Sequence, residues 1–106
     1  MGIDEGIVEE IVRRVLSVGR PARIILFGSA ASGTMTRDSD IDLLVIEPSP
    51  ANPREESLRI RAALRGMGYP FDVFVMASER FEESKGLIGG LAYPANKYGK
   101  VIYAGA

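Results

Sequence analysis

Two short apolar runs, joined by a turn and a loop, constrain the fold of this chain more than any other feature of its sequence. Residues 22–27 form the first run, which Gly28 ends abruptly, and residues 40–46 form the second, which ends before Pro48. Apolar runs of this length that are rich in β-branched residues and bounded by Gly or Pro are typical of buried strands. The sequence therefore predicts two β-strands early in the chain.

Helical patterns flank these two strands. Residues 4–18 repeat apolar side chains at the spacing of an amphipathic helix, and Asp4 is its expected N-cap. A second helix is expected to begin after Asn52, because Asn is a favoured N-cap and Pro53 suits the first helical position. Gly66 is expected to end it.

The second half of the chain is less regular. Residues 71–76 form a third β-rich run, and residues 79–84 are expected to form a short helix capped by Ser78. Residues 100–104 are expected to form a short strand or an extended tail. The order helix, strand, strand, helix, strand, helix predicts a small α+β or α/β sandwich in which helices flank a mixed sheet.

Length and composition narrow the class of protein. A chain of 106 residues suits one domain, over residues 1–106. The apolar share of 46% and charged share of 25% are ordinary for a globular protein, and the net charge of −1 gives no signal for nucleic-acid binding. No apolar run is long enough to cross a membrane, and the N-terminus lacks a secretory signal pattern. We therefore expect a cytoplasmic protein.

The chain contains no Cys and no His. These absences exclude disulfides, thiolate zinc sites, thiol nucleophiles, imidazole metal ligands and Ser-His-Asp triads. Any chemistry must use carboxylates, hydroxyls, Lys, Arg and backbone amides. Such a ligand set, made entirely of oxygen atoms, suits a hard cation such as Mg²⁺.

Asp40 and Asp42 open the second predicted strand. Residues two apart in a strand point to the same face, so their carboxylates should lie roughly 7 Å apart and could share two cations. Without a metal ion they would repel each other and raise each other's pKa. The alternative interpretation is that Asp40 ends a loop and Asp42 faces solvent.

Asp72 opens the third predicted strand in the same way. If that strand is a neighbour of the second, three carboxylates converge at one end of the sheet, as in two-metal sites for phosphoryl or nucleotidyl transfer. Otherwise Asp72 is a loop residue after Pro70. Gly28 and Ser29 form a turn that a phosphate could approach, but the chain lacks the Lys that a P-loop needs after Gly33.

Together these motifs resemble the DNA polymerase β-type nucleotidyltransferase superfamily. The residues that carry the resemblance are Gly28-Ser29-x-x-x-Gly33, Ser39-Asp40-Ile41-Asp42-Leu43 and the later strand residue Asp72. The short length and the ending at residues 99–103 resemble its minimal nucleotidyltransferases, which are prokaryotic antitoxins often paired with a HEPN-domain toxin. The resemblance implies the polymerase β-like nucleotidyltransferase fold.

The resemblance also implies roles for individual residues. Asp40 and Asp42 would hold two Mg²⁺ ions, with Mn²⁺ as an alternative, and through them the triphosphate. Asp72 would hold the catalytic metal and help to deprotonate the attacking hydroxyl. Gly28 and Ser29 would bind the β- and γ-phosphates, and Gly33 completes the nucleotide-binding motif.

The implied reaction transfers a nucleoside monophosphate, AMP from ATP, to a hydroxyl group. No residues remain for an acceptor domain, so we expect the acceptor to be a protein partner, a HEPN-type toxin by resemblance. A non-catalytic module that neutralises a toxin by stoichiometric contact is the alternative.

One departure from the family's pattern favours that alternative. The arginine that family members often carry between the Ser and the second Gly is replaced here by Ala30, Ala31 and Ser32. Arg37, Lys97 and Lys100 are candidates to compensate, and Asp38 matches no ligand position and is interpreted as a loop residue.

Overall fold

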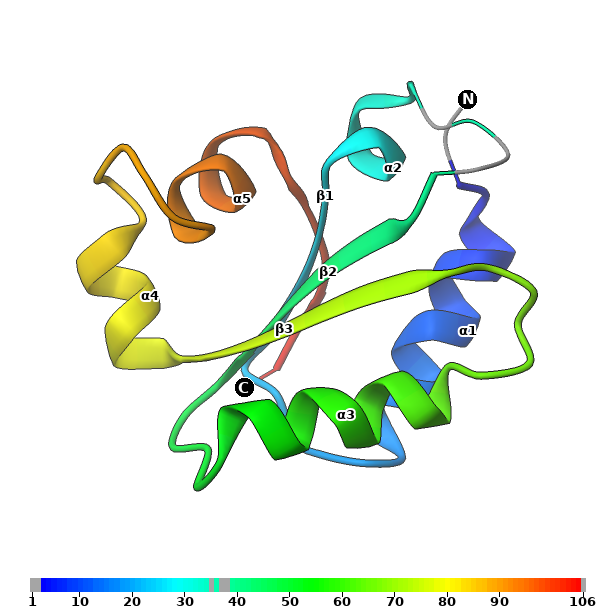
Figure 1. The fold of residues 1–106 in the computed structure, drawn as a ribbon, viewed down its shortest axis with the longest axis horizontal. Helices are drawn as coiled ribbons and strands as arrows, with labels where there is room; N and C mark the ends of the chain where they lie inside the picture. The colour runs from blue at the N-terminus through cyan, green and yellow to red at the C-terminus, as the bar shows by residue number, and fades with distance from the viewer. Residues whose placement is uncertain (1–2, 35, 37–38, 106) are drawn as a thin grey trace.

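One four-stranded sheet organises the part of the chain that the structure, a computed structural model, describes, which is residues 3–34, 36 and 39–105. Helices cover both faces of this sheet (Figure 1). The elements in chain order are α1 (Glu5–Leu16), β1 (Arg23–Phe27), α2 (Ser29–Ser32), β2 (Ile41–Glu47), α3 (Pro53–Ala63), β3 (Phe71–Ala77), α4 (Ser78–Ser84), α5 (Ala92–Tyr98) and β4 (Lys100–Ala104).

The strand order in the sheet is β3-β2-β1-β4. Strand β1 is antiparallel to both β2 and β4, whereas β2 and β3 are parallel. A parallel pair needs a crossover connection, which α3 provides. The predicted mixed sheet flanked by helices is therefore confirmed.

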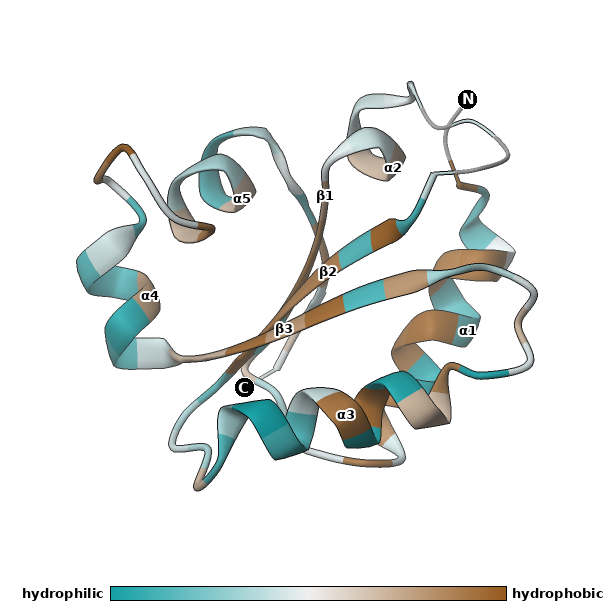
Figure 2. Cartoon of the chain, in the orientation of Figure 1, coloured by the Kyte–Doolittle hydropathy of each residue, from teal (hydrophilic) through white to brown (hydrophobic). Residues whose placement is uncertain are grey.

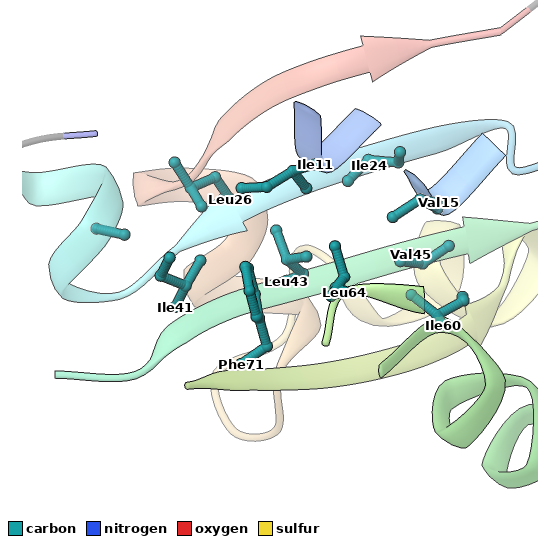
Figure 3. Close-up of a cluster of buried hydrophobic side chains, with 11 residues drawn as sticks. Ile11, Val15, Ile24, Leu26, Ile41, Leu43, Val45, Ile60, Leu64 and Phe71 are labelled. Carbon is teal, nitrogen blue, oxygen red and sulfur yellow. The ribbon is translucent and has the colours of Figure 1, made fainter. Parts of the chain in front are cut away.

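The two faces of the sheet carry separate hydrophobic cores. Strand β2 is buried on both, which explains why it reads as a continuous apolar run and not as an alternating pattern. Figure 2 shows this run as brown through the centre of the molecule. The core shared with α1 and α3 contains Ile11, Val15, Ile24, Leu26, Ala30, Ile41, Leu43, Val45, Ile60, Leu64 and Phe71 (Figure 3). The core shared with α4 and α5 contains Ile25, Phe27, Leu44, Ile46, Phe81, Ala92 and Ala95.

The predicted caps hold for the two long helices. The carboxylate of Asp4 accepts a hydrogen bond of 2.9 Å from the backbone N–H of Ile7, and the side chain of Asn52 accepts one of 3.1 Å from the N–H of Glu55. The predicted cap of α4 is wrong, because Ser78 is its first helical residue and Ala77 occupies the cap position.

Helices α2 and α5 were not predicted. Helix α2 has only four residues, too few to show a helical period. Helix α5 follows glycines at positions 86, 89 and 90 and contains Pro94 in its first turn, where a proline is tolerated because that N–H has no helical partner. Its buried residues, Ala92 and Ala95, are too small to mark an apolar face.

Two neighbouring carboxyl groups, those of the buried Glu47 and the partly buried Glu56, lie where β2 ends against the start of α3. The side chain of Glu47 is only 7% exposed. Burial, a hydrogen bond with the side chain of Glu56 and the charge of Glu56 raise the pKa of Glu47 to about 7, while Arg59 opposes the shift. Gly19 makes room for the pair, since a Cβ there would lie 2.8 Å from an oxygen of each carboxyl group.

This pair should make the stability of the fold depend on pH. Because the folded state raises the pKa of Glu47 from 4.5 to about 7, its stabilising contribution is complete below pH 4.5 and is lost as the pH rises through 7. Glu47→Gln, which stays neutral, should be more stable than the wild type at pH 8, by on the order of 2 kcal/mol. Urea denaturation between pH 5 and pH 8 measures this difference.

Glu9→Gln, at an exposed position of α1, is the control and should follow the wild-type pH dependence. If Glu47→Gln loses as much stability as the wild type over this range, the assigned pKa of Glu47 is wrong.

Candidate active site

Asp42 and Asp72 are paired residues of the parallel strands β2 and β3. Paired residues of neighbouring strands point to the same face, and the strands lie about 4.8 Å apart, so the two carboxylates are neighbours. Asp40 directly precedes β2, and the N–H of Ile41 donates a 2.8 Å hydrogen bond to the carbonyl of Pro70, which ties the starts of the strands together. The three aspartates therefore converge at one edge of the sheet.

The strand alternation places Asp42 and Asp72 on the face that α4 and α5 cover. Asp42 shares this face with Leu44, and Asp72 shares it with Phe74. The rings of Phe27 and Phe74 lie there with their centroids 6.1 Å apart. Phe27 is also the direct partner of Asp42 across β1 and β2, so the carboxylate of Asp42 lies next to the aromatic end of this core.

The environment of these carboxylates opposes their ionisation. Burial, then the charges of Asp72 and Asp40, raise the pKa of Asp42. Burial also raises the pKa of Asp72, together with a hydrogen bond to the side chain of Asp40 and the charge of Asp40, while Arg61 opposes the shift. Carboxylates whose pKa is raised by burial and by a neighbouring carboxylate are typical of sites that hold a cation or move a proton.

Gly28 begins the turn after β1 and touches the aspartate cluster. Its φ of +72° lies in the region that side chains rarely adopt, and a Cβ there would overlap the carboxylate oxygen Oδ2 of Asp42. Both its conformation and its close approach therefore require glycine. Ser29 follows as the first residue of α2, so the turn that the sequence predicts lies directly beside Asp42.

Gly33 ends the one-turn helix α2 in a left-handed conformation, with φ of +80°. Its N–H donates a 3.1 Å hydrogen bond to the carbonyl of Ser29. The structure thus places Gly33 at the far end of α2 from Gly28.

The basic residues that are candidates to replace the missing motif arginine differ in their positions. Lys100 is paired with Leu26 across β1 and β4, two residues before Gly28, so it lies at the same end of the sheet as the turn. Lys97 lies over the rings of Tyr93 and Tyr98, at 5.6 and 5.3 Å from their centroids. Arg37 and Asp38 lie outside the described residues.

A groove that the sequence did not predict adjoins the aspartates on the β3 side. It has a volume of about 520 Å³ and runs between the end of α3 and the start of β3. We call it the α3 groove; its lining residues are Asp40, Leu58, Arg61, Leu64, Arg65, Tyr69, Pro70, Phe71 and Asp72.

The chemistry of the three aspartates fits a hard divalent cation, since carboxylate oxygens are its preferred ligands. Over residues 3–34, 36 and 39–105, however, no three acidic side chains are already arranged as a metal site. The ligands are brought together by the strands, and their side chains would have to rotate to complete the coordination. The roles of Asp40, Asp42 and Asp72 as ligands remain predictions.

Comparison with known proteins agrees with this fold and motif. The family model of the nucleotidyltransferase domain matches residues 6–93. The chain therefore belongs to the nucleotidyltransferase domain family. No match is found among curated protein sequences. In the described part of the chain, every helix is too short or too polar to cross a lipid bilayer.

Solved structures share the fold at low sequence identity. One is a toxin–antitoxin complex with AMP-PNP, which is 20% identical with a TM-score of 0.66, over 92% of this chain and 73% of that chain. Another is a mutant of the MntA–HpeT toxin–antitoxin in which two aspartates, two positions apart, are replaced by glutamate. It is 16% identical with a TM-score of 0.63, over 97% of this chain and 75% of that chain. The fold is thus that of minimal nucleotidyltransferases found in toxin–antitoxin pairs.

The contact between Gly28 and Asp42 can be tested by substitution. Gly28→Ala should destabilise the fold by about 1–3 kcal/mol, because it combines a strained φ with overlap. Gly33→Ala, strained but in open space, should cost less, and Gly86→Ala, in open space without a positive φ, should cost least. Urea denaturation of the three variants measures the order of these losses of stability.

A double mutant separates the two contributions. In the Asp42→Ala background, Gly28→Ala should lose part of its effect, because the overlapping carboxylate is gone. An equal loss of stability for Gly28→Ala and Gly33→Ala in the wild-type background would contradict the contact.

Proposed function

We propose that this chain is a metal-dependent nucleotidyltransferase that transfers AMP from ATP to a hydroxyl group of a protein partner. The observation that carries the proposal is the direct pairing of Asp42 with Asp72, next to Asp40 and to the glycine turn at Gly28. This arrangement puts three carboxylates and a turn that a phosphate can approach at one edge of one sheet.

The residues of the site have different proposed roles in the reaction. Asp40, Asp42 and Asp72 would hold Mg²⁺, which supplies charge neutralisation for the triphosphate and the leaving group. Gly28 and Ser29 would present the turn to the β- and γ-phosphates. Asp72, whose raised pKa suits a proton acceptor, would orient the acceptor hydroxyl.

In the proposed step the hydroxyl oxygen forms a bond to the α-phosphorus. The bond between the α-phosphorus and the oxygen that bridges to the β-phosphate breaks, and its electron pair leaves with pyrophosphate. The hydroxyl proton passes to the carboxylate of Asp72. The protein contributes mainly by positioning the two reactants, as is general for transfer to phosphorus.

The solved relatives support this choice of substrate and partner. One was crystallised with AMP-PNP, an ATP analogue, and both are complexes of a toxin with its antitoxin. The other carries glutamates at two aspartates with the spacing of Asp40 and Asp42. We infer that this chain is likewise the antitoxin of a HEPN/MNT pair, with the toxin as acceptor.

A non-catalytic binding module remains the second candidate. Ala30, Ala31 and Ser32 supply no cation beside the turn, so the protein itself neutralises little of the triphosphate charge. Lys100 lies at this end of the sheet and is the candidate to compensate, although its partner Leu26 faces the core shared with α1 and α3, on the opposite face from Asp42. If it does not, contact with the toxin would suffice for neutralisation without chemistry.

Transfer of label separates the two functions. Incubation with the protein encoded next to this chain, Mg²⁺ and ATP labelled at the α-phosphate should label that partner. Asp40→Ala and Asp42→Ala should reduce the labelling by at least 10²-fold, on the scale of lost electrostatic stabilisation. Glu83→Ala, at an exposed position of α4, is the matched control and should not change it.

Neutralisation of the toxin by each variant is measured in parallel. No labelling by the wild type, together with full neutralisation by both aspartate variants, would favour the binding module and contradict the enzyme.

A further inference from the structure

The α3 groove lies on the opposite side of the aspartates from the glycine turn. In the sheet, β2 separates β1, which leads into the turn at Gly28, from β3, which borders the groove. Asp40 and Asp72 belong to the wall of the groove. A group bound there therefore lies beside Asp40 and Asp72, at the edge strand β3, and away from the proposed phosphate turn at Gly28.

The groove is lined by two arginines. Arg61 is in α3, and Arg65 directly follows the C-cap of that helix, Leu64. Within the described part of the chain, neither makes an ion pair. Arg61 acts electrostatically on Asp72. Once bound divalent cations neutralise the negative charge of the aspartates, these two guanidinium groups give the groove a net positive charge.

The groove also offers apolar surface for a side chain. Leu58 is 56% exposed and Tyr69 is 38% exposed, so the groove presents one aliphatic and one aromatic side chain to solvent. Leu64 and Phe71 are buried beneath them as part of the core. Exposed apolar side chains between arginines are typical of surfaces that bind a peptide, where aromatic residues and Arg contribute most to affinity.

We propose that the α3 groove binds the acceptor segment of the protein partner, and that this segment carries acidic residues next to its hydroxyl-bearing residue. This inference rests on the proposed function. The acidic residues pair with Arg61 and Arg65, and the side chain that bears the hydroxyl lies against Leu58 and Tyr69 with its oxygen next to Asp72.

A protein segment suits the groove better than a nucleic acid does. Two arginines and a chain of net charge −1 lack the extended basic surface that a phosphate backbone needs. A short peptide needs only a local match of charge and an apolar contact. Charge complementarity of this kind selects the partner and orients it.

The test uses defined probes and does not depend on catalysis. Fluorescein-labelled Glu-Glu-Tyr-Glu-Glu is titrated with the full chain in Mg²⁺ and AMP-PNP, and its anisotropy is followed. The same peptide with Lys in place of Glu, and a five-nucleotide RNA with a free 3′ hydroxyl, are titrated alongside. We expect the acidic peptide to bind at least tenfold more tightly than either of the others.

A pair of charge-matched double variants locates the binding. Arg61→Gln/Arg65→Gln should weaken binding of the acidic peptide by about tenfold. Arg54→Gln/Arg80→Gln, which removes the same charge from exposed positions outside the groove, should change it by less than about twofold, as expected for screened surface charges. Melting temperatures measured with and without Mg²⁺ and AMP-PNP check that both variants fold and bind nucleotide.

The outcomes are distinct. An equal loss of peptide binding in both double variants, or tighter binding of the basic peptide or the RNA, would overturn the assignment of the groove. The proposed function would stand in that case, provided that Mg²⁺ and AMP-PNP raise the melting temperature of the wild type. The absence of that rise in the wild type would count against the proposed function instead, and selective loss in Arg61→Gln/Arg65→Gln would still support the groove as a site for acidic peptides.

Discussion

Repulsion among three carboxylates at one edge of the sheet is the interaction on which the account of this protein depends. The pairing of β2 with β3 forces Asp42 and Asp72 together, and Asp40 adds a third charge. A fold selected for stability alone has no use for this arrangement, which raises the pKa of Asp42 and of Asp72 and so opposes their ionisation. A divalent cation bound between the carboxylates would remove their repulsion. The free energy that the fold loses to this repulsion without a ligand would then favour binding of the cation.

The mixed topology turns this cluster into a site with two sides. Because β1 ends where β2 and β3 begin, the glycine turn reaches the aspartates from one side, and the crossover through α3 brings Arg61 and Arg65 to the other. The close approach of Gly28 to the carboxylate of Asp42 holds the glycine turn beside the aspartates. The same strand order thus separates the proposed site of the triphosphate from the proposed site of the acceptor.

The convergence of the three aspartates was predictable from the sequence, and much of the rest of the site was not. Asp40, Asp42 and Asp72 each open a short apolar run, and a run of that kind identifies a strand without knowledge of its neighbours. Arg61 and Arg65 look like the solvated face of any helix, and only the tertiary contact of α3 with β3 makes them lining residues of a groove. The Glu47–Glu56 pair was missed for the same reason, because it joins the end of one element to the start of another. Helices α2 and α5 were too short, or too rich in small residues, to show a period.

The most direct test of the carboxylate account is the melting temperature of Asp42→Asn with and without Mg²⁺ and AMP-PNP. Without ligand, the variant should melt above the wild type at pH 8, because it removes a partly buried charge whose ionisation the fold opposes. With ligand, the wild type should gain stability and the variant should not, since a ligand stabilises only the state that binds it. We thus predict that Asp42→Asn raises the melting temperature without ligand and removes the increase that the ligand causes. A variant that is less stable without ligand, or that gains as much from Mg²⁺ and AMP-PNP as the wild type, would contradict it.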